Sequence, residues 1–147
     1  MNIITRQVKD NPLTVIIEYP EYTDHVAGLV RRISSLDIRF AASIDDRRVS
    51  IGLPEVYYVE SVERKVFIYT AKDVYRLDQS MAMLDDMTKE TALVRISRTC
   101  IMNTDHLKEI RQVRNSRLEA LLDNGERLIV SRKYLKDIKR VFQKGRV

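Results

Sequence analysis

Short runs in which apolar and polar residues alternate follow one another along most of the chain after Pro54. A period of two is the pattern of a β-strand that buries one face, so this part is predicted to be mainly β. The strands are expected at residues 56–60, 66–70, 74–77, 93–96, 109–114, 117–122 and 127–130. Asn124-Gly125 lies between the last two strands, and this dipeptide predicts a hairpin with a type I′ turn.

Short helices are predicted between or after these strands, where apolar residues recur every three or four positions. Ser80 is expected to cap one of them, and Ser131 is expected to cap a helix over 132–143. Thr104 or Asp105 can cap a single helical turn between the two. The part after Pro54 therefore reads as mainly β with short helices.

The first part of the chain shows a different order of elements. A β-branched apolar run predicts a strand at 13–19, which Pro20 ends. A helix is predicted over 24–35, capped by Thr23 or Asp24, because its apolar residues fall on one face.

Two further short strands are expected at 38–44 and 49–51, around a polar turn. Pro54 then marks a boundary, so we expect a small α+β segment at 1–53 and a second domain at 54–147. The first segment is too short for a phospho-receiver domain, which needs alternating strands and helices over more than about 100 residues.

The composition of the 147 residues argues against several functional classes. The longest apolar runs are about five residues, far below the roughly 20 that span a membrane, and the start lacks the apolar stretch of a signal peptide. One cysteine and two histidines allow neither an intrachain disulfide nor a zinc cluster at standard spacings. The four glycines form no phosphate-binding loop, and neither histidine accompanies a nucleophile motif. We therefore expect a cytoplasmic protein that is not an enzyme, with no cofactor, metal or small-molecule substrate.

The positive charge is concentrated in the C-terminal third of the chain. Residues 95–147 hold fourteen basic and six acidic residues, a net charge of +8. Residues 1–54 are neutral, and residues 55–94 carry a net charge of −3. A locally basic segment indicates a surface that binds a polyanion, although a solvated strand or helix surface accounts for the charge equally well.

Several motifs follow one another in a distinctive order after Pro54. They are EVYYVES, a basic turn ERK, strands around AKD, the short helix SMAMLDDM, LVRISRTCIMNTDHLKEI, the hairpin RLEALLDNGERLIV and SRKYLKDIKRVF. In this order they resemble the LytTR family of DNA-binding domains found in bacterial transcription regulators, over residues 54–143. Residues 1–53 suggest the subgroup whose members carry a short N-terminal βα extension in place of the receiver domain of a response regulator.

The resemblance implies an elongated, multi-sheet β domain that inserts loops, rather than a recognition helix, into successive major grooves of promoter direct repeats. It implies that Arg64 and Lys65 approach one groove, that Arg98 contacts DNA, and that Arg132 reaches a second groove. It further implies a homodimer on DNA. Ser97 and Thr99 stand where many family members carry histidine and serine.

The chemistry of these residues agrees with the implied roles. Arginine can bond guanine through two nitrogens, whereas Lys65, Lys133, Ser97 and Thr99 suit contacts to phosphate. Arg132 and Lys133 stand at the start of a predicted helix, where cations oppose the helix dipole, so their presence favours a functional role.

Four neighbouring residues have a structural explanation instead. Arg95 is expected to pair with a carboxylate, Asn103 and Asp105 to serve in turns or caps, and Cys100 to be a buried small hydrophobe.

Two other functions stay open at this point. The chain is alternatively a protein-interaction module, whose residues 1–53 dock a second protomer or a membrane-bound inhibitor. It is alternatively an RNA-binding protein whose aromatic side chains stack on bases, although aromatics that alternate with core positions are more typical of packing.

Overall fold

The computed structural model describes residues 1–114 and 117–138. One group of strands consists of β1 (Arg39–Ile44), β2 (Arg47–Gly52), β3 (Tyr58–Val62), β4 (Lys65–Tyr69), β5 (Val74–Leu77), β6 (Leu93–Ser97) and β7 (Cys100–Asn103). A second group consists of β8 (Leu107–Val113), β9 (Arg117–Leu122) and β10 (Arg127–Val130). The helices are α1 (Asp24–Leu36) and α2 (Met81–Met87), with 3-10 turns η1 (Leu53–Glu55), η2 (Thr104–His106) and η4 (Arg132–Tyr134).

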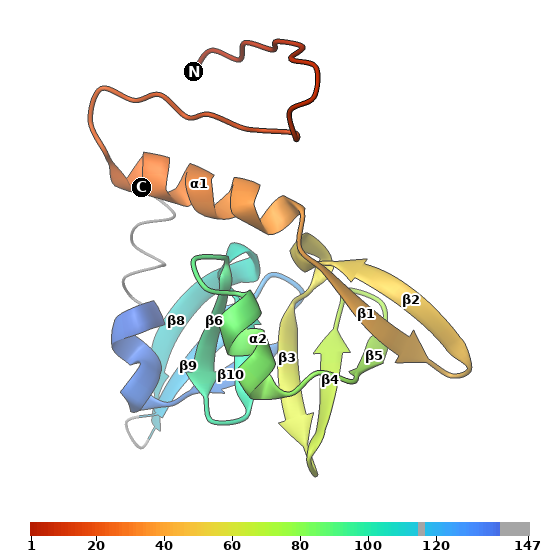
Figure 1. Cartoon of the computed structure of the whole chain (residues 1–147). Helices are drawn as coiled ribbons and strands as arrows, with labels where there is room; N and C mark the ends of the chain where they lie inside the picture. Colours follow the sequence, from red (N-terminus) through yellow and green to blue (C-terminus); the bar gives the residue numbers. More distant parts are fainter. Residues whose placement is uncertain (115–116, 139–147) are drawn as a thin grey trace.

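The strands form two antiparallel sheets (Figure 1). The large sheet has the order β2-β1-β5-β4-β3-β7-β6, and the small sheet has the order β10-β9-β8. The prediction of a mainly β chain with short helices and more than one sheet is confirmed. No helix within the described ranges is long and apolar enough to cross a membrane.

Strands β3 and β7 of the large sheet contribute to a core on each face, since neighbouring residues of a strand point to opposite sides. Val59 and Ile101 belong to a core that also contains Leu84 of α2. Tyr58 and Met102, one residue along in each strand, belong to a second core shared with the small sheet. The molecule therefore has three layers, with the large sheet between α2 and the small sheet.

The ring of His106 links the two sheets. It stacks on Tyr57 with 3.9 Å between ring centroids. Its Nε2 lies 2.9 Å from the carbonyl oxygen of Pro54, and its Nδ1 lies 3.3 Å from a carboxylate oxygen of Asp123 in the β9–β10 loop. These contacts hold the β9–β10 hairpin in a fixed place on the large sheet.

The helix predicted over 24–35 is present as α1, which crosses one end of the molecule (Figure 1). The Thr23 hydroxyl accepts a hydrogen bond from the Val26 N–H at 3.3 Å, which confirms the predicted cap. The strands expected after it are also present, as β1 and β2.

The hairpin of β1 and β2 precedes Pro54 in the chain, but it belongs to the same sheet as the strands that follow Pro54. Ala42 and Ser43 of β1 pair with Leu77 and Arg76 of β5. The division of the chain after residue 53 stays a prediction, but the residues on its two sides share one sheet and one core.

The strand predicted at 13–19 is wrong. This segment has no strand partner in the described part of the chain, and of its residues only Ile17 is half-buried. A β-branched run favours a strand only where a neighbouring strand supplies hydrogen bonds, and here none does.

The hairpin predicted around Asn124-Gly125 is present, but its turn is not type I′. The Leu122 N–H donates to the carbonyl of Glu126, and the Gly125 N–H donates to that of Leu122. Gly125 has a φ of 90°, whereas Asn124 is not among the residues with positive φ. A type I′ turn needs positive φ at both central residues, so the loop is a three-residue connection that ends in a left-handed glycine.

Two predicted caps also differ from the structure. Ser131 stands before the last helical segment, but its side chain makes no capping hydrogen bond and the first turn, η4, is 3-10. Helical structure continues to residue 138, and the rest of the predicted helix lies outside the described residues. The turn η2 is capped by Asn103, which accepts from the Asp105 N–H at 2.9 Å, and not by Thr104 or Asp105.

Candidate nucleic-acid interface

The first candidate segment is the turn between β3 and β4. Val62 pairs with Lys65, so Glu63 and Arg64 form a two-residue hairpin loop. Both have positive φ, 51° and 67°, which is the backbone of a type I′ turn. Non-glycine residues adopt this conformation at a cost of roughly 1–2 kcal/mol each. Asn-Gly would adopt this turn with less strain, but the sequence has two charged residues at its tip instead.

The second segment is the turn between β6 and β7, which contains Arg98 and Thr99. The pairing of β6 with β7 shifts by one residue between Arg95 and Ser97, which is a β-bulge at Ile96. Ser97 is half-buried, and its hydroxyl accepts from the Thr99 N–H at 3.3 Å. The hydroxyl of Ser97 therefore helps to close the turn, while Arg98 and Thr99 are exposed.

The third segment is the start of η4, where Arg132 and Lys133 are exposed. The preceding residue, Ser131, donates its N–H to the carbonyl oxygen of Ile96 at 2.8 Å. A hydrogen bond to the bulged residue of β6 thus fixes the position of the residue before Arg132. The Lys133 Nζ lies 5.5 Å from the centroid of the Tyr134 ring.

These three segments lie at the same end of the molecule, the lower end in Figure 1. The Ser61 N–H of β3 donates to the carbonyl of Thr99 at 2.8 Å, so the β3–β4 turn starts beside the β6–β7 turn. Glu63 is two residues further along, or about 7 Å at the usual rise of a strand. All seven residues predicted to contact DNA thus belong to segments that hydrogen bonds join into one surface: Arg64, Lys65, Ser97, Arg98, Thr99, Arg132 and Lys133.

Three basic side chains of this surface lack a carboxylate partner, unlike several other arginines of the described chain. Within the described residues, no carboxylate forms an ion pair with Arg64, Lys65 or Arg98. By contrast, Arg127 lies 2.9 Å from Glu119 in the small sheet. Cations without a carboxylate partner are available to an anion, which is the state that a phosphate or base contact requires.

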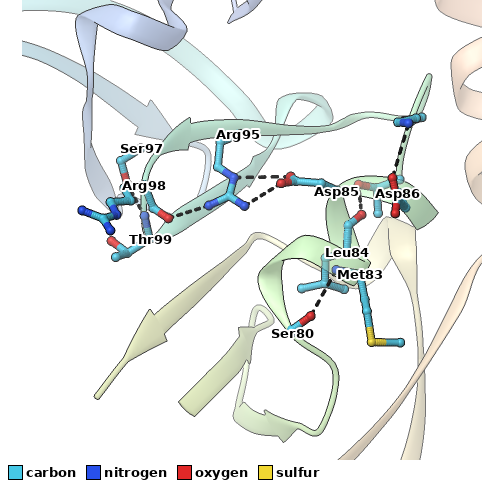
Figure 2. A network of polar contacts seen from close by, with 11 residues as sticks. Ser80, Met83, Leu84, Asp85, Asp86, Arg95, Ser97, Arg98 and Thr99 are labelled. Carbon is cyan, nitrogen blue, oxygen red and sulfur yellow. Dashed lines mark hydrogen bonds and ion pairs between the residues drawn. The ribbon is translucent and has the colours of Figure 1, made fainter. Parts of the chain in front are cut away.

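The expected ion pair of Arg95 is confirmed. Its guanidinium nitrogens lie 2.6 and 3.3 Å from the two carboxylate oxygens of Asp85 in α2 (Figure 2). Its remaining nitrogen donates to the carbonyl oxygen of Arg98. Sequence reasoning did not find Asp85 as the partner, because ten residues and an intervening turn separate it from Arg95.

The other structural explanations are also confirmed. Asn103 is fully buried and donates from Nδ2 to the carbonyl of Val56 at 2.8 Å, while Asp105 belongs to η2. Cys100 is buried, and this burial, with a smaller contribution from the charge of Glu60, raises the pKa of its thiol to about 12.

Among the described residues, the aromatic side chains within 57–69 do not form an exposed platform. Tyr58 and Tyr69 stack on each other with 4.2 Å between ring centroids, and burial raises the pKa of both hydroxyls. Tyr57 stacks on His106. Tyr58 is buried and Tyr57 and Tyr69 are half-buried, so these rings serve in packing, as the alternation with core positions predicts.

The backbone features of the surface went unpredicted. The left-handed conformation of Glu63 and Arg64 follows from the length of the hairpin loop. Once Val62 pairs with Lys65, only these two residues connect β3 and β4, and two-residue loops favour positive φ. The bulge at Ile96 has no comparable signal, because the apolar alternation of β6 continues through it.

The chain is similar to known regulators and to a solved domain. It is 26% identical over 105 residues to the sensory transduction protein LytT of Bacillus anthracis, and 26% identical over 106 residues to the transcriptional regulatory protein LytR of Staphylococcus aureus. These alignments cover 71% and 72% of this chain but only 43% of each relative, so the chain spans less than half the length of the relatives.

A solved LytTr DNA-binding domain from Bacillus cereus has the same fold. The two structures superpose with a TM-score of 0.65 at 21% sequence identity, over 70% of this chain and 94% of the other. Residues 46–143 match the family described as the LytTr DNA-binding domain, and this range is two thirds of the chain. The chain belongs to the LytTr DNA-binding domain family.

Proposed function

We propose that the chain is a bacterial transcription regulator that binds double-stranded DNA sequence-specifically. In this proposal the β3–β4 turn, the β6–β7 turn and the start of η4 enter successive major grooves at promoter direct repeats. The observation that carries the proposal is the convergence of these segments, distant in sequence, on one end of the molecule. Membership of the LytTr DNA-binding domain family supports it.

The residues of this surface suit two kinds of contact. Arg64, Arg98 and Arg132 present guanidinium groups, which can donate two hydrogen bonds to guanine O6 and N7. Lys65 and Lys133 suit phosphate, which positions the protein on the duplex without reading its sequence. A major groove admits a two-stranded ribbon, and the tight β3–β4 hairpin is such a ribbon.

The experiment that tests the proposal begins with the full chain and random genomic fragments. Bound duplexes are sequenced, and the affinity of a selected fragment is compared with that of a scrambled duplex at several salt concentrations. We expect Arg98→Ala and Arg132→Ala each to reduce the preference for the selected fragment by about 1–3 kcal/mol. A protein that binds both duplexes equally would refute sequence-specific binding.

Arg47→Ala is the matched control for these variants. Arg47 is exposed at the start of β2, and β1 and β5 separate it from β4 in the order of the large sheet. The same charge is removed, so any general electrostatic effect on affinity is reproduced while the contact surface stays intact. Equal losses in Arg47→Ala and Arg98→Ala would contradict the assignment of the contact surface.

Two protomers per site form part of the proposal, and the N-terminal segment supports it. Nine of the exposed large hydrophobic residues fall within residues 1–22: Met1, Ile3, Ile4, Val8, Leu13, Val15, Ile16, Tyr19 and Tyr22. A second copy of the chain offers a segment of the same length and apolar content, which an isologous dimer interface requires. A membrane-bound inhibitor is the alternative occupant of this segment.

A further inference from the structure

The inference concerns Asp85 and Arg95, and it rests on the proposed function. We propose that these two residues position the β6–β7 turn for DNA, so that α2 determines the direction in which Arg98 is presented. Neither residue is assigned to the contact surface itself. Both act through the backbone of the turn.

The geometry of the pair is that of an anchor. Asp85 uses both carboxylate oxygens to hold one side of the Arg95 guanidinium, at 2.6 and 3.3 Å. A two-pronged contact fixes the plane of the guanidinium as well as its distance from the carboxylate. Since Asp85 belongs to α2, which contributes Leu84 to the core, the anchor is attached to a packed element.

The other side of the guanidinium holds the turn. The Nη1 of Arg95 donates to the carbonyl oxygen of Arg98, so the peptide between Arg98 and Thr99 has its orientation set by the pair. Figure 2 shows the carbonyl of Arg98 directed towards Arg95 and the side chain of Arg98 directed away from it. Rotation of this peptide would redirect the Arg98 side chain.

The burial of Arg95 makes the anchor stronger than an ordinary surface pair. Its side chain is 19% exposed, whereas Lys89 and Asp86, which pair at 3.3 Å at the end of α2, are 75% and 80% exposed. Reduced exposure lessens the screening of the interaction by water. All three guanidinium nitrogens of Arg95 are bonded, two to Asp85 and one to the carbonyl of Arg98, so the side chain connects α2 to the turn.

The β-bulge places this anchor where it has the greatest effect. Arg95 is the last residue before the register of β6 shifts, and the carbonyl of Ile96 leaves the ladder to bond Ser131. The strand therefore gives less support to residues 97–99 than it gives to the residues before the bulge. The Ser97 hydroxyl and the Ser61 N–H both bond Thr99, and the guanidinium of Arg95 adds a constraint on the carbonyl of Arg98.

Asp85→Asn and Asp86→Asn form a matched pair of variants. Both remove one negative charge from adjacent positions of α2, but only the first loosens the anchor. We expect Asp85→Asn to lower the preference for the selected duplex over the scrambled one about tenfold, the effect of losing one good base contact. We expect Asp86→Asn to retain the preference of the wild type.

Arg95→Lys separates charge from geometry. Lysine retains the positive charge, but its single nitrogen does not reproduce the planar fork that holds Asp85 and the Arg98 carbonyl together. The salt dependence of binding should therefore stay that of the wild type, while the preference for the selected duplex falls as in Asp85→Asn. Thermal unfolding of each variant verifies that it is folded.

A second measurement records the turn without DNA. We expect the NMR order parameters of the Arg98 and Thr99 amides to fall in Asp85→Asn and to stay unchanged in Asp86→Asn. Equal behaviour of the two variants in both measurements would overturn the inference. A gain in affinity and in salt dependence in Asp85→Asn would also overturn it, because it would mean that Arg95 contacts phosphate. Failure of the proposed function would appear instead in the wild type, as binding without preference.

Discussion

The strained turn between β3 and β4 is the residue-scale feature that most favours a functional role. Two consecutive non-glycine residues, Glu63 and Arg64, have left-handed backbone conformations at the tip of an exposed hairpin. Strain of this kind persists where the surrounding structure enforces it, and it is concentrated at sites of function. The two well-paired strands on either side of the turn enforce it here.

We predict that Arg64→Gly stabilises the protein and weakens its binding to DNA. Glycine adopts positive φ without steric cost, so the free energy of unfolding should rise by about 1 kcal/mol. The loss of a cation that approaches the groove should lower the affinity for duplex DNA and reduce the slope of affinity against salt by about one. Denaturant titration and fluorescence anisotropy measure the two effects.

Glu63→Gly is the control for this prediction. It relieves the same kind of backbone strain one residue earlier, but it removes a negative charge instead of a positive one. Its stability should therefore rise similarly, while its DNA affinity is maintained or increased. A loss of affinity in both variants would show that the strained backbone, and not the charge of Arg64, matters for binding.

We predict that the thiol of Cys100 is unreactive in the folded protein despite its place beside the β6–β7 turn. Burial raises its pKa to about 12, and the thiolate is the reactive form. Below pH 9 the thiol is protonated in the folded and the unfolded chain, so it adds nothing to the pH dependence of stability. Between about pH 9 and 12 the thiol ionises in the unfolded chain but stays protonated in the folded one, so over this range the group makes stability fall as the pH rises.

Alkylation by iodoacetamide at pH 8 tests this prediction. The reaction should be slow in buffer and should accelerate strongly in denaturant, and bound DNA should leave the slow rate unchanged. Rapid alkylation of the folded protein would contradict the prediction and support a redox role for Cys100.

The sequence places basic residues in the proposed contact surface, and it predicts that Arg95 pairs with a carboxylate without identifying Asp85. Arg95 and Arg98 are three positions apart in one basic motif, and the structure gives them opposite situations. Arg95 is paired with Asp85 from a separate helix, whereas Arg98 has an exposed side chain and no carboxylate partner in the described ranges. Which carboxylate pairs with Arg95 depends on how α2 packs beside β6, which the local sequence does not specify.

At the scale of elements, the side chain of Asn103 joins the end of β7 to η1 and η2. Asn103 of β7 bonds the carbonyls of Leu53 and Val56 at 3.4 and 2.8 Å, and its own Oδ1 accepts from Asp105. One side chain thus bonds the carbonyl of the first residue of η1 and the carbonyl just after η1, and it also caps η2. Such groups are costly to leave unpaired inside a protein.

We predict that Asn103→Ala lowers the free energy of unfolding by about 2 kcal/mol, because it leaves the buried carbonyl group of Val56 without a donor. Chemical denaturation measures this change. Asn124→Ala is the matched control, since Asn124 is exposed and caps only the Glu126 N–H at 3.0 Å. The control should lose about 1 kcal/mol or less, and equal losses in the two variants would contradict the role assigned to Asn103.

Elements were predictable where the local pattern and the tertiary contacts agree. The strand expected at 74–77 is β5 with the same bounds, because its alternating residues meet a strand on either side. The strand expected at 13–19 has an equally strong local pattern and no neighbour in the described chain. The turn at Gly125 shows the same limit, since Asn-Gly allows several hairpin geometries and the register of β9 and β10 selects one.

At the scale of the whole molecule, the two ends differ in character. One end presents the basic turns, and the opposite end is crossed by α1 (Figure 1). The exposed apolar residues 1–22 precede α1, so an interface made there stays away from the proposed DNA surface. Separation of the two surfaces would allow two protomers to associate while each contacts its own DNA repeat.

We predict that deletion of residues 1–22 converts a dimer into a monomer and leaves the fold intact. Only Ile17 of this segment is even half-buried, so its removal should leave the melting temperature nearly unchanged. The loss of exposed apolar surface should remove the association, because apolar contact drives most protein interfaces. Sedimentation of the full chain and the deletion variant, with and without a duplex carrying two sites, measures the change.

Point variants within the segment distinguish an interface from a general effect of truncation. Ile16→Asp places a charge at an apolar position that is 78% exposed, and Thr14→Asp places the same charge at an exposed polar position nearby. Only Ile16→Asp should dissociate the dimer, since burying an unpaired carboxylate in an apolar interface is costly. A full chain that sediments as a monomer on the two-site duplex would exclude this interface, and the exposed segment would then be left to a different protein such as the inhibitor.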